Sequence, residues 1–146
     1  MKILIGMDDS PHAREALNFV MRKLQLPATT NVVVASVAQE LVPAYTEVYT
    51  GAPFYSEEMS HGVLERHQEI ASEAERQLRD AGFHTEARVV HGDPRSVLVD
   101  LARLENVDLL VVGSHGRTGI SKLLMGSVAA FLIAHAPCTV MVVKLH

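Results

Sequence analysis

The sequence predicts a single doubly wound α/β domain, in which helices cover both faces of a parallel sheet. Five short apolar segments alternate along the chain with four segments whose apolar residues recur at helical spacing. Most of the short segments are continuous β-branched runs, as expected for strands buried on both faces. The 146 residues, of which 48% are hydrophobic, fit one domain (residues 1–146) with its own core.

The first strand is the apolar run of residues 1–7, and a helix follows it directly. Ser10 is a suitable N-cap for this helix, and Pro11 suits the first helical position. Pro27 is expected to end this helix. The run of residues 31–37, NVVVASV, then predicts a buried second strand.

The second helix is expected at residues 57–81, where Gly82 stops it. The next segment, residues 83–90, alternates apolar with polar residues, which predicts a half-exposed strand near a sheet edge. One stripe of the second helix consists of Val63, His67, Ile70, Ala74 and Leu78.

The remaining elements repeat the same signals. Asp93 as N-cap and Pro94 in the first turn begin a third helix. Residues 107–113 form another buried strand, a fourth helix has Ser127 at its cap, and the last strand follows Pro137. Parallel strands joined by right-handed crossovers give the predicted sheet.

Residues 39–58 show no clear period and contain all three tyrosines and two prolines, so we interpret them as a loop. A surface excursion with a few packed rings explains this composition. A lid or a dimer contact is the alternative, because long loops without secondary structure are often functional.

The composition indicates which classes of partner and which cell compartment fit the protein. The net charge of −4, without a Lys or Arg cluster, argues against nucleic acid as the main partner. The single cysteine, Cys138, suits a reducing compartment. The N-terminal apolar run is too short for a signal peptide or a membrane span, so we expect a cytoplasmic protein.

A glycine-rich stretch lies between the fourth strand and the fourth helix. Gly113, Gly116, Gly126 and Ser127 have the spacing G-x2-G-x9-G-S, which fits neither the dinucleotide fingerprint nor the Walker A loop. Glycine nevertheless lets a ligand touch the backbone, and successive amides suit anions. The stretch predicts a phosphate site in the sheet's ligand-binding crevice.

The helix that opens at Ser127 adds free N–H groups and a positive dipole end, and Arg117 can supply a formal charge to phosphate oxygens. Each residue also has a plain explanation. Gly113 can simply end a strand, Ser127 can simply cap a helix, and His115 can be an ordinary loop residue. An anion site and a helix cap need the same geometry.

The glycine spacing resembles the nucleotide-binding signature of the universal stress protein family, G-x2-G-x9-G-[ST], which Gly113, Gly116, Gly126 and Ser127 match without a gap. The resemblance covers the whole chain, through ILIGMDDSPHAREAL, HGDP and PCTVMVVK. It implies the strand order 3-2-1-4-5, a homodimer and bound ATP, with AMP or ADP as alternatives.

The resemblance also implies a set of nucleotide contacts. Asp8 and Val37 would border adenine and ribose, whereas Gly126 and its two successors would hold the phosphates. Asp8 can also help to hold Mg²⁺ on a triphosphate. The expected nucleotide-binding residues are Gly6, Met7, Asp8, Val37, Val112, Gly113, Ser114, His115, Gly116, Arg117, Gly126, Ser127 and Val128.

The last strand supports a homodimer independently of the resemblance. TVMVV would leave an exposed apolar edge, and proteins rarely leave such an edge bare. We therefore expect a two-fold dimer through the strand from Val140 to Val143.

The chain has no G-x-S-x-G, H-E-x-x-H or C-x-x-C motif. Asp8 and Asp9 lie at the predicted site, but both can be ordinary loop and cap residues. We expect an ATP-binding stress-response protein that acts as a nucleotide-dependent switch or resistance factor on an unknown protein partner. The alternatives are a slow ATP hydrolase and a nucleotide-free interaction protein.

Overall fold

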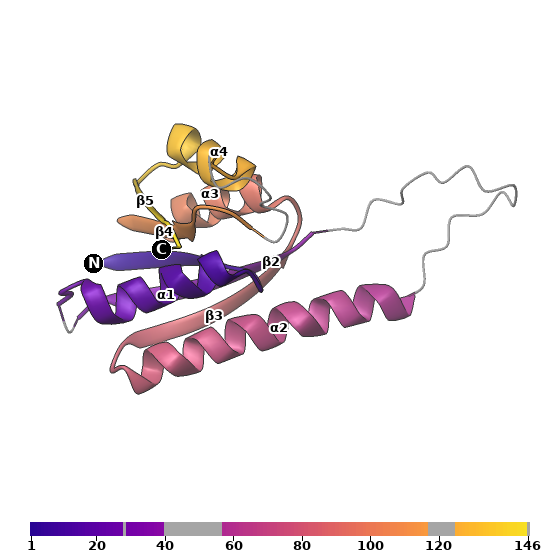
Figure 1. Ribbon diagram of the computed structural model, residues 1–146, viewed down its shortest axis with the longest axis horizontal. Coiled ribbons are helices and arrows are strands. Elements are labelled where there is room, and N and C mark those ends of the chain that lie inside the picture. The colour runs from indigo at the N-terminus through magenta and orange to yellow at the C-terminus, as the bar shows by residue number, and fades with distance from the viewer. Residues whose placement is uncertain (28, 40–56, 117–124, 146) are drawn as a thin grey trace, which may run out of the picture.

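The computed structural model describes residues 1–27, 29–39, 57–116 and 125–145. Strands and helices alternate through these ranges, as the sequence predicts (Figure 1). The elements are β1 (Lys2–Met7), α1 (Pro11–Lys23), β2 (Asn31–Ala38), α2 (Glu57–Asp80), β3 (His84–His91), α3 (Pro94–Leu104), β4 (Leu109–Gly113), α4 (Ser127–His135) and β5 (Thr139–Val143). The predicted loop at residues 39–58 lies almost wholly outside the described residues, so its role as a lid or contact stays a prediction.

The five strands form one parallel sheet in the order β3-β2-β1-β4-β5, which confirms the doubly wound α/β class. From β1 the chain winds outward through β2 to β3, then returns to β4 on the other side of β1 and continues to β5. The direction of winding therefore reverses between β1 and β4.

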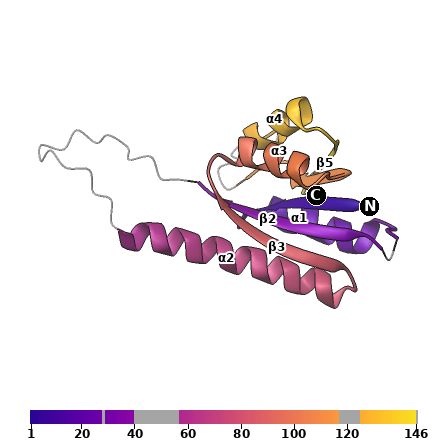
Figure 2. The same ribbon diagram turned by 180° about the vertical axis from the view of Figure 1, so that it is seen from behind.

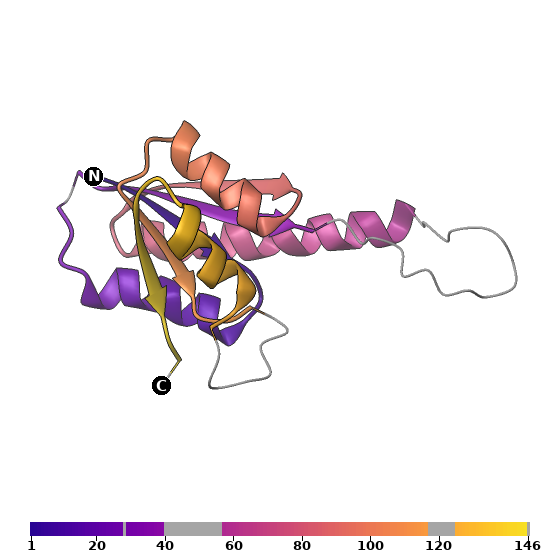
Figure 3. The same cartoon turned by 90° about the horizontal axis from the view of Figure 1, so that it is seen from above.

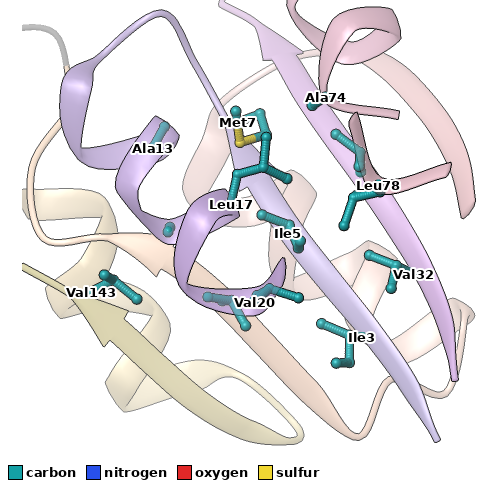
Figure 4. Close-up of a cluster of buried hydrophobic side chains, with 13 residues drawn as sticks. Ile3, Ile5, Met7, Ala13, Leu17, Val20, Val32, Ala74, Leu78 and Val143 are labelled. Carbon is teal, nitrogen blue, oxygen red and sulfur yellow. The ribbon is translucent and has the colours of Figure 1, made fainter. Parts of the chain in front are cut away.

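The helices cover both faces of the sheet, with α1 and α2 on one side and α3 and α4 on the other (Figures 1 and 2). Alternate residues of β1 point to opposite faces. Ile3 and Ile5 pack with Leu17 of α1 and Leu78 of α2, as Figure 4 shows. Leu4, on the other face, belongs to the cluster that buries the apolar residues of α3 and α4.

Most of the predicted helix ends are confirmed. The Ser10 side chain accepts a hydrogen bond from the Ala13 amide, 3.1 Å away, and the Asp93 side chain accepts one from the Arg95 amide at 3.0 Å. Gly82, after α2, has a φ of +90°, a conformation that glycine adopts without strain.

The predicted cap of the last helix is wrong by one residue. Gly126 is the N-cap of α4, and Ser127 is its first helical residue. Glycine is an acceptable N-cap, although it offers no side-chain acceptor. A Cβ at residue 126 would lie close to the backbone of Ser114 and His115, as described below, which favours glycine over serine there.

The two edge strands differ in character. Exposed and half-buried residues alternate along β3, as the polar alternation predicts, and the side chains of β5 are mostly half-buried although nearly all are apolar. No helix in the described ranges is long and apolar enough to cross a bilayer.

An ion-pair network joins β1 and β3 to Glu105, the residue that follows α3. The Lys2 ammonium lies 2.7 Å from a Glu105 oxygen, and the Arg88 guanidinium lies 3.4 Å from the other. The hydrogen bond from Lys2 holds the pKa of the Glu105 carboxyl below its usual range. These charges lie at the edge of the sheet opposite the predicted ligand site.

Candidate functional site

The site predicted from the sequence lies where β1 and β4 end side by side. The two strands pair in parallel, and the turn into α1 and the segment after β4 both leave from this carboxyl edge (Figure 3). The winding of the chain reverses between these strands, and in folds of this class ligands bind outside the carboxyl ends of the strands at that point.

The turn from β1 to α1 is held by its own side chains. An oxygen of the Asp8 carboxylate accepts a hydrogen bond from the Ser10 amide, 3.0 Å away. The Ser10 hydroxyl, which caps α1, also lies 3.5 Å from the His115 carbonyl oxygen and donates to it. Ser10, which the sequence indicated only as a cap, therefore also joins this turn to the segment after β4.

Two backbone hydrogen bonds at Ser114 fix the start of that segment. The Ser114 amide donates to the Val143 carbonyl at 2.8 Å, which extends the pairing of β4 with β5 by one residue. The Ser114 carbonyl accepts from the Gly126 amide, also at 2.8 Å. This second bond brings the start of α4 back to the end of β4, although the two residues are well separated in the sequence.

The signature glycines make close contacts within the protein itself. A Cβ on Gly113 would lie 2.6 Å from the carbonyl carbon of His12, in the first turn of α1. A Cβ on Gly126 would lie 3.1 Å from the Ser114 carbonyl oxygen, and one on Gly116 would lie 3.0 Å from an Asp8 carboxylate oxygen. Packing of α1 against the end of β4 therefore requires glycine at 113, and contact with backbone atoms favours glycine at 126, whether or not a ligand is bound. At 116 the neighbour is only the end of the Asp8 side chain, which can move aside.

The start of α4 presents backbone donors at this site. The first hydrogen bond of the helix runs from the Ala130 amide to the Gly126 carbonyl, at 3.0 Å. The amides of Ser127, Val128 and Ala129 precede it and so have no carbonyl within the helix to which they can donate. Together with the helix dipole, these amides favour an anion.

The side chains around these donors are mixed in character. Ser114 is only 4% exposed, and its hydroxyl lies 3.1 Å from Nδ1 of His115. The His115 ring also contacts the ring of His12, with 5.1 Å between the ring centres. Asp8 and Asp9 supply carboxylates, but no group of three metal-ligating side chains occurs within the described ranges.

The structure brings most of the predicted site residues together, but not all in the expected way. Gly6, Val37 and Val112 lie among the core packing under α3 and α4: Val37 and Val112 are buried, and a Cβ on Gly6 would meet the Val112 side chain at 3.0 Å. Val37 is the second-to-last residue of β2. Arg117 lies outside the described residues, so its predicted phosphate contact stays a prediction.

A cavity of about 370 Å³ lies on the other side of Asp8, between α1 and α2. Met7 and Leu17 supply apolar walls, and charges of both signs, among them Arg14 and Glu73, also line it. None of the described residues of the glycine-rich segment lines this cavity, whereas Met7 and Asp8 of the predicted site do.

Comparison with known proteins agrees with this architecture. The model of the universal stress protein family matches residues 1–144. A universal stress protein of Thermus aquaticus, encoded in the QAH/OAS sulfhydrylase 3′ region, is 32% identical over 143 residues, which are 97% of each chain.

Solved structures give the same result. Protein MJ0577, whose sequence comes from Methanocaldococcus jannaschii, has a TM-score of 0.84 at 30% identity, with 99% of this chain and 96% of that chain covered. The Archaeoglobus fulgidus universal stress protein, solved in complex with dAMP, has a TM-score of 0.65 at 24% identity, covering 99% and 98% of the two chains. Proteins of this fold have also been solved with AMP and with cAMP. By the family match and the relative from Thermus aquaticus, the chain belongs to the universal stress protein family.

Proposed function

We propose that the chain binds an adenine nucleotide, ATP in the first place, at the carboxyl edge of β1 and β4. The observation that carries the proposal is the 2.8 Å hydrogen bond between the Gly126 amide and the Ser114 carbonyl. It holds the amino end of α4 beside the end of β4, so that backbone donors and the Asp8 carboxylate border one crevice. The adenine nucleotides bound by proteins of the same fold support this choice of ligand.

In this proposal the phosphates lie on the amides at the start of α4. Those of Ser127 and Val128 donate to phosphate oxygens, which the helix dipole also favours. Asp8 accepts hydrogen bonds from the ribose hydroxyls, because a carboxylate repels phosphate unless a cation lies between them. Mg²⁺ bound mainly by the phosphates can use Asp8 as its one protein carboxylate.

The geometry supports binding better than catalysis. Ser114 and His115 form a hydroxyl–imidazole pair beside the proposed site, but Ser114 is buried. A buried hydroxyl is poorly placed to activate water, so we expect ATP hydrolysis to be slow at most. We therefore propose a regulatory protein whose state depends on bound nucleotide and which acts on a protein partner.

The proposal includes a homodimer through β5. This strand is the edge of the sheet next to β4, and its Val140, Met141 and Val142 are only half-buried. Antiparallel pairing with a second copy would satisfy the free backbone groups and cover the apolar side chains.

Thermal unfolding tests the nucleotide proposal. The protein, stripped of nucleotide, is heated alone and with saturating Mg-ATP, AMP or GTP. A ligand at 100 times its Kd adds about 2.7 kcal/mol of stability, which raises Tm by several degrees in a domain of this size. ATP and AMP should raise Tm, whereas GTP should not.

A matched pair of glycine variants tests whether ATP raises Tm by binding at the proposed site. Gly116→Ala places a methyl group against Asp8 in the proposed site, whereas Gly62→Ala adds one in open space on α2. Only Gly116→Ala should lose the stabilisation by ATP. Unchanged Tm with every nucleotide would refute the proposal and favour the nucleotide-free interaction protein.

A further inference from the structure

A buried hydrogen-bonded chain connects α2 to the last residue of β1. His67 of α2 is 6% exposed, and its Nδ1 lies 2.8 Å from the Ser36 hydroxyl oxygen on β2, which is fully buried. The same hydroxyl donates to the Met7 carbonyl oxygen at 2.9 Å. The sequence placed His67 on the apolar stripe of its helix and gave no sign of this contact.

The number of protons fixes the direction of the chain. A serine hydroxyl carries one proton, and Ser36 donates it to the Met7 carbonyl. The Ser36 oxygen must then accept at its other contact, so His67 donates from Nδ1. Nδ1 carries a proton in one neutral tautomer of histidine and in the cation. The chain therefore reads His67 to Ser36 to Met7.

The end point of the chain lies next to the proposed site. Met7 directly precedes Asp8, whose carboxylate holds the Ser10 amide and lies against Gly116. Ala74 and Leu78 of α2 also pack with β1, through apolar contacts. Apolar contacts hold the helix against the sheet but are non-directional, whereas a hydrogen bond fixes the orientation of the carbonyl that accepts it.

We propose that His67 is a positioning residue for the nucleotide site. Through Ser36 it fixes the Met7 carbonyl, and so the orientation of the Met7–Asp8 peptide that carries the Asp8 carboxylate into the crevice. This inference rests on the proposed function. A merely structural contact would affect stability alone, whereas a positioning residue also changes the geometry of Asp8.

Four variants separate these roles. His67→Leu removes the donor, and Ser36→Ala removes the connection with the smallest possible change of volume. His67→Asn keeps an N–H donor close to the position of Nδ1. Leu78→Ala weakens the packing of the same helix on the same face, and it controls for lost stability.

Two measurements are made on each folded variant. The amide resonances of Asp8 and Ser10 are recorded by nuclear magnetic resonance without nucleotide, and the Kd for Mg-ATP is measured by calorimetry. His67→Leu and Ser36→Ala should shift both amides and raise Kd roughly 2- to 10-fold, the equivalent of one hydrogen bond of average strength. His67→Asn should restore both values, whereas Leu78→Ala should lower Tm and leave both unchanged.

Wild-type Asp8 and Ser10 resonances in His67→Leu and Ser36→Ala would overturn the inference, as would a Kd in His67→Asn as high as that in His67→Leu. Because the resonances are measured without nucleotide, they decide the question even if the wild-type protein binds no ATP. In that case the proposed function fails, and the amide shifts alone show whether His67 positions Asp8.

Discussion

The backbone of His12 occupies the space that a side chain on Gly113 would need. A Cβ at position 113 would lie 2.6 Å from the His12 carbonyl carbon and 2.8 Å from its oxygen. Helix α1 can therefore pack against the end of β4 only because residue 113 has no side chain. The first glycine of the signature is explained by the fold without reference to a ligand.

Gly113→Ala should accordingly destabilise the protein. The methyl group meets main-chain atoms, which can move aside only if α1 moves with them, and we expect a loss of about 1–3 kcal/mol in the free energy of unfolding. Urea denaturation measures this loss. Gly62→Ala is the control, because its Cβ meets nothing within 4 Å and alanine favours a helix by up to about 1 kcal/mol. Equal stability of the two variants would contradict the packing argument.

Alanine substitutions at the other two signature glycines, Gly126 and Gly116, should differ in their effect on Tm. A Cβ on Gly126 meets the Ser114 carbonyl oxygen and His115 Cα, which are backbone atoms, whereas one on Gly116 meets the end of the Asp8 side chain. We expect Gly126→Ala to lower Tm clearly and Gly116→Ala to leave it nearly unchanged, because a carboxylate can rotate away. A lower Tm for Gly116→Ala than for Gly126→Ala would contradict this order.

Thr30→Val should stabilise the protein. Thr30 is 1% exposed, and its hydroxyl oxygen has no hydrogen-bond partner within the part of the chain that the structure describes. An unsatisfied buried polar group costs about 1–3 kcal/mol, and valine has nearly the same shape. Chemical denaturation should show a gain of about 1 kcal/mol, whereas Thr29→Val, at the exposed neighbouring position, should change stability by less than about 0.5 kcal/mol. A loss on Thr30→Val would show that the hydroxyl has a partner.

Asp93 should make stability depend on pH in the acid range. The hydrogen bonds from the Arg95 side chain and backbone hold the pKa of the Asp93 carboxyl below its usual range. The stabilisation is therefore complete above the pKa of the unfolded chain, near 3.9, and is lost as pH falls through the lower pKa of the folded state. Asp93→Ala should cost about 1 kcal/mol at pH 7, as for other N-caps, and less at pH 2.

Asp93→Asn is the control for this effect, because asparagine also caps helices but does not titrate. Its stability should fall less steeply than that of the wild type between pH 4 and pH 2. If the stability of the two proteins falls equally between pH 4 and pH 2, other carboxylates account for the loss of stability in acid.

If the proposed dimer forms through the edge of β5, a charged side chain on this strand should dissociate it. Met141→Lys places an ammonium on the half-buried strand, where it disfavours pairing between edges. Sedimentation at micromolar concentration should show a dimer for the wild type and a monomer for this variant. Leu104→Lys, at a position 77% exposed on α3, should remain dimeric. A wild-type monomer would remove the dimer from the proposal.

The sequence predicted the elements because their signals are local. Ser10, Asp93 and Gly82 act at helix ends within a few residues of themselves, and the alternation that marks β3 as an edge needs only its own eight residues. The predicted cap of α4 was one residue late, because the N-cap is Gly126, where contact with the Ser114 backbone favours glycine over a residue with a capping side chain. Contacts between distant residues were not predictable in this way.

The site illustrates the same limit. The glycine spacing indicated the edge of the sheet at which we propose the site, but the contact of Gly113 with His12 and the bond of Ser36 with His67 depend on how helices pack on the sheet. The local sequence around each of these residues does not predict which distant residue it will contact. A histidine on an apolar helical stripe predicts burial, but not the hydroxyl that it meets.

The contact between Gly126 and the Ser114 carbonyl has a consequence for evolution within the family. Selection for a stable fold alone is enough to retain glycine at this position, as it is at Gly113. A descendant that had lost its ligand would therefore keep much of the motif, and classification by the motif would count it among the binders. Residues that face the crevice without supporting the fold, and not the glycines, are where the loss of a ligand would first leave a trace.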